Sequence, residues 1–457
     1  MAVQPSNGQL YSPGITRISV TGFKSLAMKT EVEIRPLTVL AGANSSGKSS
    51  FMQPLLMMKQ TLESDFIAAG PFLLSGPYVQ FTETKQFLSR TGALIDRQKA
   101  FTLEFSFNEG MTAGMTYSTE PEVGLSIAES WGSNAAKQSE WRLNKRLTAE
   151  ELSAMLLRLG SVPQVMAHAG LTEPSVQDTG FYQSILYSVP DSSEYKGLRM
   201  MRRELYYMQE NMELNTLIGR LIYVSGVRGS QSRKNLLAEI TEHGFFPGSF
   251  ENYAPSLIYS WQQSGNRPKI HELVKALGAL ELATGISQVR LNESELEIRI
   301  PRTLNLADND FVNIADVGLA VPTILPVLVA LIQADSGQLV YAEQPELHLH
   351  PRAQWRLAQL LAQAANRGVR LVIETHSSLL LQGILTCVAN GAITPENVAL
   401  HWFTRNEKGI TKVTTANIDA EGRFGDWPSD FDDVEMKASN DYLDAVEAKL
   451  MASKGAA

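Results

Sequence analysis

The chain has little of what several large classes of protein require. It contains one cysteine, Cys387, among 457 residues, so neither a disulfide framework nor a cysteine-rich zinc site can form. Its most apolar window, residues 318–332, is interrupted by two prolines and is shorter than the roughly 20 residues that span a membrane. The first residues lack the charged segment and apolar stretch of a signal peptide. These absences predict a soluble, cytoplasmic protein without membrane contact.

The chain also lacks an excess of positive charge. Its formal net charge is −8, so no overall basic field attracts nucleic acid, and any such contact needs a local patch. Two basic clusters are candidates: Arg228, Arg233 and Lys234, and Lys196, Arg199, Arg202 and Arg203. Exposed charge runs are usually solvated surface, so binding of nucleic acid or of a partner through these clusters is the less favoured interpretation.

What the chain does have is a complete phosphate-binding loop. Residues 42–49 read G-A-N-S-S-G-K-S and fill every position of the motif G-x-x-x-x-G-K-[ST]. A β-like run at 37–40 precedes the loop and a helix-like run follows it, which is the context that the motif requires. In such a loop the backbone N–H groups hold a polyphosphate, Lys48 reaches the β- and γ-phosphates, and the Ser49 hydroxyl binds Mg²⁺. The sequence therefore predicts an ATP site formed by Gly42, Asn44, Ser45, Ser46, Gly47, Lys48, Ser49 and Ser50.

The remaining pattern predicts an α/β fold. Short strands are expected at 15–20, 31–34 and 37–40, and from 313 to 405 strands at 338–343, 369–374 and 398–404 alternate with helices, which indicates a parallel sheet. A last helix is expected at 434–450. The middle of the chain is polar and carries helical periodicity at 147–159 and 196–218. We therefore expect three parts: residues 1–107 and 221–457, which carry the predicted strands, and residues 108–220 as a helical insertion.

A second set of residues fits the other half of a nucleotide site. A phosphate loop needs a carboxylate at the end of a neighbouring strand to hold Mg²⁺, and Glu343 ends an apolar strand. The predicted metal residues are therefore Ser49 and Glu343. About thirty residues later, a second apolar strand ends in E-T-H-S at 374–377, which includes His376. His348 and His350 have the alternation of metal ligands, but no third ligand lies nearby, so metal binding is disfavoured there.

With these motifs in order, the chain resembles a known group of ATPases. The segments N-S-S-G-K-S-S at 44–50, E-Q-P-E-L-H-L-H-P at 343–351 and E-T-H-S at 374–377 resemble the AAA_15 ATPases, also called OLD-like or SMC-like ABC ATPases. The segments G-F-K-S at 22–25 and G-D-W-P at 425–428 resemble the branch with a DUF3696 C-terminal region. The resemblance implies an ABC-type ATPase head with a mixed sheet, of which residues 1–107 and 221–457 would form the two halves. It also implies that two protomers pair head to tail, with each ATP between one phosphate loop and the partner's signature segment.

The resemblance assigns further roles, and at two places this chain departs from the family. Residues 316–323 occupy the position of the signature segment, where Gly318 is present but the usual second glycine and Ser-Gln are absent. Gln344 stands where the family usually has the glutamate that activates water, and an amide cannot take a proton at pH 7. By the same resemblance, His376 would touch the γ-phosphate. Glu346 is the remaining candidate base, although its position after Pro345 favours the other side of the turn.

These residues lead to two hypotheses on function. The first is an ATP-clamped, oligomerising sensor or scaffold of a prokaryotic antiphage defence complex, as in Septu-type and PARIS systems, that controls a separate effector. Both slow and absent ATP hydrolysis are compatible with Gln344. About 80 residues follow His376, too few for a TOPRIM nuclease, so we expect the effector on another chain. The alternative is a DNA-binding repair ATPase of the RecF or SMC type, which the acidic charge and the lack of a long coiled coil disfavour.

Overall fold

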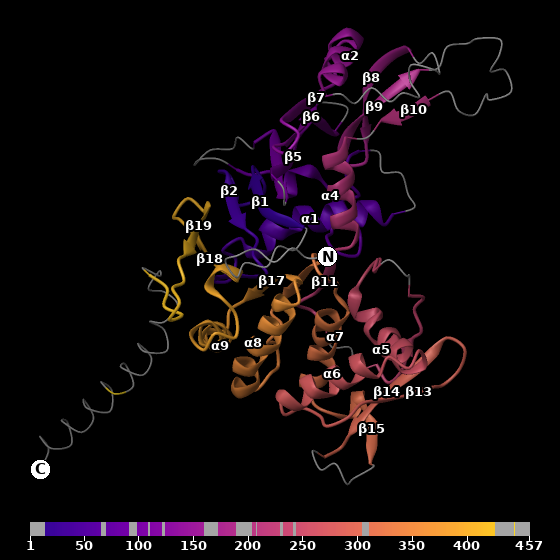
Figure 1. Ribbon diagram of the computed structural model, residues 1–457, viewed down its shortest axis with the longest axis vertical. Coiled ribbons are helices and arrows are strands. Elements are labelled where there is room, and N and C mark those ends of the chain that lie inside the picture. The colour runs from indigo at the N-terminus through magenta and orange to yellow at the C-terminus, as the bar shows by residue number, and fades with distance from the viewer. Residues whose placement is uncertain are drawn as a thin grey trace, which may run out of the picture.

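The computed structural model describes most of the chain (Figure 1). The described residues are 14–64, 70–90, 98–107, 110–120, 124–159, 172–188, 203–206, 208–228, 232–240, 244–303, 310–425 and Leu443. The helix expected at 434–450 lies outside them apart from Leu443, and so do Lys196, Arg199 and Arg202. No described helix has the length and apolar character needed to cross a membrane.

The centre of the fold is a six-stranded sheet that joins segments from both ends of the chain. Its strands, in spatial order, are β11 (Ile222–Val224), β16 (Leu339–Glu343), β17 (Arg370–Thr375), β3 (Leu37–Gly42), β18 (Val398–Arg405) and β19 (Thr411–Ala416). The first five are parallel and β19 is antiparallel to β18. The sheet is therefore mixed, as the family resemblance implies, and β17 lies between the strand that leads into the phosphate loop and β16.

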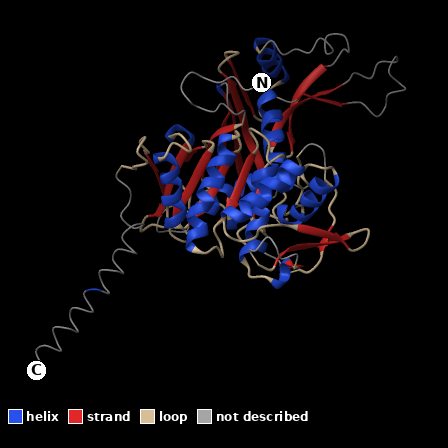
Figure 2. Ribbon diagram, turned by 60° about the horizontal axis from the view of Figure 1, so that its bottom comes forward, coloured by secondary structure: helices blue, strands red, loops and turns tan. Residues whose placement is uncertain are grey.

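Helices cover both faces of this central sheet (Figure 2). On one face, Leu37, Val39 and Ala41 of β3 share a core with α7 (Ala320–Gln333), α8 (Pro351–Asn366) and α9 (Ser378–Ala389). On the other face, Leu40 packs with α1 (Lys48–Leu62). A strand that is buried on both sides reads as a continuous apolar run, which is why these strands are visible in the sequence.

A second six-stranded sheet is antiparallel and packs on the α1 side of the central one (Figure 1). Its spatial order is β2 (Thr30–Glu33), β1 (Ile15–Thr21), β4 (Ala100–Phe107), β5 (Met111–Glu120), β6 (Gly124–Asn134) and β7 (Ser139–Leu143). Along β4, buried and half-buried residues alternate without a break. This alternation is typical of a strand with one face on the core and one toward solvent.

The expectation that residues 108–220 are helical is wrong, because this stretch contains strands as well as helices. This stretch contains β5, β6 and β7, the strands β8 (Thr172–Thr179), β9 (Tyr182–Ser188) and β10 (Arg203–Tyr206), and the helices α2 (Ala149–Arg158) and α4 (Gln209–Gly219). The helix expected at 147–159 is confirmed as α2, which begins with a capping box between Thr148 and Glu151. The helix expected at 196–218 is confirmed only in its last part, since residues 203–206 form a strand. Because β5 pairs with β4, one sheet also crosses the expected boundary at residue 107, although the boundary itself stays a prediction.

Residues after α4 complete the part of the molecule below the central sheet in Figure 1. It contains the helices α5 (Ala254–Gln263) and α6 (Arg267–Ala279), which pack against α7 in the same core. A small antiparallel sheet lies beside them and consists of β12 (Asn235–Leu236), β13 (Ser287–Arg290), β14 (Glu295–Pro301) and β15 (Phe311–Asn313). Short 3₁₀ helices lie at Thr84–Gln86, Phe250–Asn252, Ile314–Asp316 and Pro395–Asn397.

A buried histidine joins the two large sheets. The Nε2 atom of His401, on β18, lies 2.9 Å from the backbone oxygen of Glu33 on β2, and its Nδ1 atom lies 3.0 Å from Thr415 Oγ1 on β19. A backbone oxygen only accepts, so Nε2 carries the proton and Nδ1 accepts from the threonine hydroxyl. Burial lowers the pKa of His401 to about 4, against a smaller opposing effect of the Glu33 carbonyl.

We expect His401 to make the fold acid-sensitive. The unfolded chain, with a histidine pKa of 6.5, takes up the proton before the folded chain does. The stabilisation from the neutral ring is thus complete above pH 6.5 and is lost as the pH falls toward 4, by about 3 kcal/mol in the free energy of unfolding. Urea unfolding of the wild type and of His401→Gln at pH 7 and pH 4.5 measures this difference. Equal losses in the two proteins would contradict the expectation.

Candidate functional site

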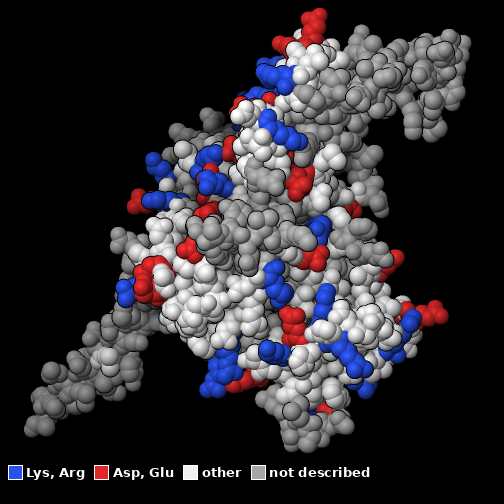
Figure 3. Space-filling model, in the orientation of Figure 1, with Lys and Arg blue, Asp and Glu red and all other residues white. Residues whose placement is uncertain are grey.

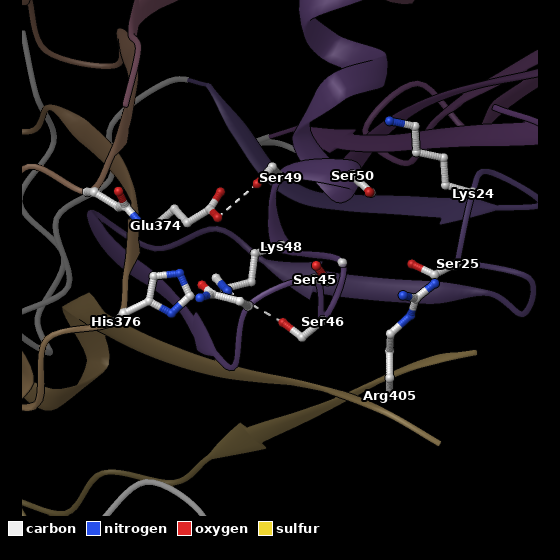
Figure 4. Close-up of a pocket in the computed structure, with 13 residues that line it drawn as sticks. Lys24, Ser25, Ser45, Ser46, Lys48, Ser49, Ser50, Glu374, His376 and Arg405 are labelled. Carbon is white, nitrogen blue, oxygen red and sulfur yellow. Dashed lines mark hydrogen bonds between the residues drawn. The ribbon is translucent and has the colours of Figure 1, made fainter. Parts of the chain in front are cut away.

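The phosphate loop forms one wall of a cavity of about 400 Å³ at the carboxyl ends of the central strands (Figure 4). The loop connects the end of β3 to the start of α1. The residues that line the cavity are Asn44, Ser45, Ser46, Gly47, Lys48, Ser49 and Ser50 of the loop, together with Lys24, Ser25, Gln344, Glu374, His376 and Arg405. The structure therefore brings together segments that lie more than three hundred residues apart in the chain.

Two glycines allow the loop to pack against the last strands of the sheet. Gly42 and Gly47 have φ angles of 141° and 110°, which side chains rarely adopt. A Cβ atom would clash with the backbone oxygen of Phe403 at Gly42 and with the hydroxyl of Thr411 at Gly47. That hydroxyl lies 2.7 Å from the backbone oxygen of Ser46 and 2.8 Å from Ser25 Oγ, so β19 supports the loop from behind.

The start of α1 fits an anion. Gly47 occupies the N-cap position, and no described side chain caps the N–H groups of the first turn. These groups carry the positive end of the helix dipole, and their residues line the cavity. A phosphate would supply the acceptor that a capping side chain supplies elsewhere. The loop residues predicted from the sequence, apart from Gly42, thus line one cavity that fits a phosphate group, and Gly42 shapes its edge.

Lys48 is buried inside the loop. Its Nζ atom lies 3.0 Å from the backbone oxygen of Gly42 and 2.9 Å from that of Ala43. Burial lowers the pKa of Lys48, while the carboxylate of Glu374 raises it. The ammonium group is therefore only partly compensated by neutral carbonyls, which suits it to bind an anion.

The carboxylate beside Ser49 is Glu374 and not Glu343. The Ser49 hydroxyl donates to Glu374 Oε1 over 2.8 Å. Glu343 ends β16, one strand further from the loop, and does not line the cavity among the described residues. Glu343 is the register partner of Glu374, and the Tyr341 hydroxyl lies 3.1 Å from Glu343 Oε1 and 2.9 Å from Glu374 Oε2. The pairing of Ser49 and Glu343 at Mg²⁺ stays a prediction.

Gln344 and His376 line the cavity as predicted. Gln344 has a φ angle of 43°, and its N–H donates to the backbone oxygen of Glu374 over 2.7 Å, which fixes the turn after β16 against β17. His376 follows β17, and its ring points toward Lys48 in Figure 4. Burial, and then the charge of Lys48, lower the pKa of His376. Both side chains therefore line the cavity in which the loop would hold a phosphate, and their chemical roles stay predictions.

Glu346 lies outside the cavity. Its side chain is buried, with the residue 7 % exposed, and it is not one of the residues that line the cavity. The Thr375 hydroxyl donates to its Oε1 atom over 2.5 Å, and the N–H of His376 approaches the same atom at 3.4 Å. Burial raises the pKa of Glu346. The arrangement fits a residue that supports the main chain at His376, and it does not support Glu346 as a base acting on water in the cavity.

The signature segment does not reach this cavity. Gly318 is exposed, and a Cβ atom there would meet nothing within 4 Å. The helix α7 begins directly after it, at Ala320, without a side-chain cap among the described residues. A nucleotide held by the loop of this protomer is thus not touched by the protomer's own Gly318.

The guanidinium of Arg228 contacts main-chain oxygens of the protein itself. Its guanidinium donates to the backbone oxygens of Thr323, Ser225, Glu343 and Gln344, over 2.8, 2.7, 2.6 and 2.5 Å. These donors are turned inward to main-chain oxygens, and binding of nucleic acid through Arg228 stays a prediction. Its role is to fasten the first turn of α7 to the end of β16.

The two other members of that cluster are exposed and paired. Arg233 forms an ion pair with Asp316, and Lys234 forms one with Glu295 over 3.2 Å. On the face shown in Figure 3, basic and acidic side chains are interspersed. Binding of nucleic acid through Arg233 and Lys234 stays a prediction.

Four residues that sequence reasoning did not assign complete the cavity: Glu374, described above, and Lys24, Ser25 and Arg405. Lys24 has a φ angle of 48°, donates to Gln53 Oε1 over 2.5 Å and lies over the ring of Phe81. Ser25 contacts Thr411, and Arg405 extends from the end of β18. The segment at 22–25 was visible only as part of the family resemblance, and no local signal marks Arg405.

Comparison with protein families agrees with this site. Residues 14–156 match the AAA_15 family, described as "AAA ATPase domain", and residues 249–382 match the AAA_21 family, described as "AAA domain, putative AbiEii toxin, Type IV TA system". Residues 393–438 match "Protein of unknown function (DUF3696)". The resemblance to AAA_15 ATPases and to DUF3696 is thus confirmed over these residues. The chain therefore contains two segments that match ATPase domain families.

Comparison with solved structures gives distant likenesses. One is a structure described as an SmcHead bound to the C-winged helix domain of ScpA, with a TM-score of 0.49 and 12 % identity, covering 89 % of this chain and 98 % of that one. A second is an SMC head domain from Thermotoga maritima, with a TM-score of 0.39, 10 % identity and coverage of 88 % and 98 %. A third is an Smc head domain from Pyrococcus furiosus bound to the C-terminal domain of ScpA, with a TM-score of 0.43, 10 % identity and coverage of 88 % and 96 %. At these scores the likenesses support no statement on activity or partners. No curated protein sequence matches the chain.

Proposed function

We propose that this chain is an ATP-binding subunit that Mg²⁺-ATP clamps into a head-to-tail dimer or larger assembly. In that state it serves as the sensor or scaffold of an antiphage defence complex and controls a separate effector. The proposal rests on the separation between the phosphate loop and the signature segment around Gly318. The phosphate loop lines a cavity with Gln344 and His376, whereas the segment around Gly318 is exposed and lies outside that cavity.

The residues of the loop would hold the nucleotide. Lys48 and the N–H groups of the first turn of α1 would bind the phosphates, and the Ser49 hydroxyl would bind Mg²⁺. Bound Mg²⁺ would neutralise part of the charge on the β- and γ-phosphates. His376 would contact the γ-phosphate, and Gln344 would orient water without taking its proton, so hydrolysis would be slow or absent.

The partner's signature segment would close the site. Gly318 and the uncapped first turn of α7 are exposed, so they are free to meet the nucleotide of a second protomer. A two-fold axis would then generate two equal sites. Because Pro322 lacks an N–H group and no serine follows Gly318 in the segment, the partner's contact with the phosphates would be weak. Assembly would therefore depend on ATP at high occupancy.

The defence role rests on the resemblance and on the family matches. AAA_15 and DUF3696 match the two ends of the chain, and the description of the AAA_21 match names a toxin of a type IV toxin–antitoxin system. A toxin or nuclease encoded beside the gene is the kind of effector that this setting implies. Co-expression with the product of the neighbouring gene, followed by phage challenge, tests this role. ATP-dependent DNA binding that weakens with salt, without protection from phage, would favour the DNA-repair alternative instead.

We expect the wild type to shift from monomer to dimer or larger species when Mg²⁺-ATP is added, as measured by light scattering after size exclusion. Gly318→Phe should prevent the shift and still bind ATP in the phosphate loop, with at most the affinity that assembly adds being lost, because the position is exposed and has space for a side chain. Gly425→Phe is the matched control, since it is also exposed with nothing within 4 Å of its Cβ position, and it should assemble like the wild type. A wild type that stays monomeric with bound ATP would contradict the proposal.

A further inference from the structure

The hairpin of β18 and β19 contacts both ends of the phosphate loop. It lies within residues 393–438, the part of the chain that matches a family of unknown function. At the first end of the loop, a Cβ atom at Gly42 would overlap the backbone oxygen of Phe403 on β18. At the second end, a Cβ atom at Gly47 would overlap the hydroxyl oxygen of Thr411 on β19. The hairpin therefore lies close enough to the loop to determine its shape.

The buried hydroxyl of Thr411 fixes one peptide of the loop. It lies 2.7 Å from the backbone oxygen of Ser46 and 2.8 Å from Ser25 Oγ. A backbone oxygen only accepts, so the Thr411 hydroxyl donates to Ser46 and accepts from Ser25. In a trans peptide the C=O and N–H groups point in opposite directions, so the N–H of Gly47 points away from Thr411. Thr411 thus orients one of the N–H groups at the start of α1.

Arg405 extends into the cavity from the end of β18. Its Nε atom donates to the backbone oxygen of Gly409 over 3.0 Å, which fixes the side chain across the turn of the hairpin. Its two terminal nitrogens have no partner among the residues that the structure describes. In Figure 4, Arg405 lies on the opposite side of Lys48 from Glu374 and His376. A free, planar guanidinium is therefore present at the end of the cavity away from His376.

That end of the cavity has no aromatic ring to stack on a base. None of the 13 described lining residues is a phenylalanine, tyrosine or tryptophan. In the proposed function the γ-phosphate faces His376, so the base extends toward the side of Arg405. The Lys24 ammonium at this end already bonds to Gln53 Oε1 and lies over the ring of Phe81. A guanidinium can stack on a flat ring, so Arg405 supplies the missing planar partner.

We propose that the β18–β19 hairpin is part of the nucleotide site, with Arg405 stacked on the base and Thr411 as a positioning residue for the phosphate loop. The proposal rests on the proposed nucleotide function and gives a role to residues within the matched region of unknown function. Every base has a flat face, so stacking alone distinguishes poorly between bases. Arg405 therefore contributes equally to the binding of ATP and of GTP.

The test of Arg405 separates the base from the phosphates. Isothermal titration of the full chain measures the affinities for Mg²⁺-ATP, Mg²⁺-GTP and Mg²⁺-tripolyphosphate. Arg405→Gln should lower the affinity for each nucleotide about 10-fold and leave that for tripolyphosphate unchanged. Arg405→Lys should show the same loss, because it keeps the charge but not the planar group. An equal loss for tripolyphosphate, or full nucleotide affinity in Arg405→Lys, overturns the assignment to the base.

The test of Thr411 has a different signature, because the loop binds phosphates whether or not a base is attached. Thr411→Val should lower the affinities for ATP and for tripolyphosphate by the same factor, about 10-fold. Thr411→Ser keeps the hydroxyl and should bind both ligands like the wild type. A loss confined to the nucleotides, or a loss in Thr411→Ser as large as that in Thr411→Val, contradicts the positioning role.

The matched control is Lys412→Gln, which removes one positive charge from the same hairpin at an exposed position outside the cavity. It should bind all three ligands like the wild type, and thermal melting without ligand checks that each variant folds. If Thr411→Val does not fold, the Arg405 variants still test the proposal. A wild type that binds neither ATP nor tripolyphosphate overturns the proposed function. A wild type that binds both, with Arg405→Gln indistinguishable from Lys412→Gln, overturns this inference alone.

Discussion

Lys48→Ala is expected to reduce the affinity for ATP by at least about 100-fold. The Lys48 ammonium lies among the loop carbonyls, where only neutral groups accept from it, and a bound triphosphate would provide charged acceptors. Charge-assisted hydrogen bonds contribute about 1.5–3 kcal/mol each, so their loss corresponds to roughly two orders of magnitude in the dissociation constant. Isothermal titration with Mg²⁺-ATP measures this change.

The control for this change is Lys408→Ala, which removes a lysine from the exposed turn between β18 and β19. It alters the net charge by the same amount and lies outside the residues that line the cavity. Its affinity for ATP should equal that of the wild type. An affinity of Lys48→Ala that matches this control would refute the assignment of the loop.

Gln344→Glu is expected to raise the rate of ATP hydrolysis by about 100-fold or more. Gln344 lines the cavity with His376, and a carboxylate there can take the proton of an attacking water, a form of catalysis that contributes about 10²–10⁴-fold. Glutamate and glutamine have the same backbone preference, so the φ angle of 43° is no new source of strain. Phosphate release under single-turnover conditions measures the rate.

The matched control is Gln138→Glu. Gln138 also has a positive φ, 49°, but it lies in the exposed turn between β6 and β7. Its hydrolysis rate should not change. If Gln344→Glu is no faster than this control, the missing base does not limit the rate, and the altered signature segment becomes the candidate cause.

Four strands of the central sheet, β3, β16, β17 and β18, could be predicted because they are almost entirely buried, whereas the sequence pattern identifies neither β11 nor the partly exposed β19. The runs that became β3, β16 and β17 are continuously apolar and bounded by turns, so their position and direction followed from the sequence. The strands β5 and β6 could not be predicted in the same way. They mix small, polar and apolar residues, such as M-T-A-G-M-T-Y-S-T-E in β5, and their pairing partners, not their own pattern, specify them.

The residues of the candidate site also divide into those that the sequence pattern predicts and those that it does not. The loop residues, Gln344 and His376 follow strands and turns that local pattern reveals, and the structure places them in one cavity. The contact between Ser49 and Glu374 depends on which strand lies next to β3, and no local pattern encodes that lateral order. Arg228 illustrates a further limit, because the sequence gives the charge of a side chain but not its direction.

The support that Thr411 gives to Ser46 has a consequence for biosynthesis. The hydroxyl and the loop are separated by 365 positions along the chain. A ribosome makes the N-terminal end first, so the whole motif emerges while the strand that backs it does not yet exist. Until Thr411 has been translated, the nascent chain contains all residues of the phosphate-loop motif but lacks the strand that supports the loop.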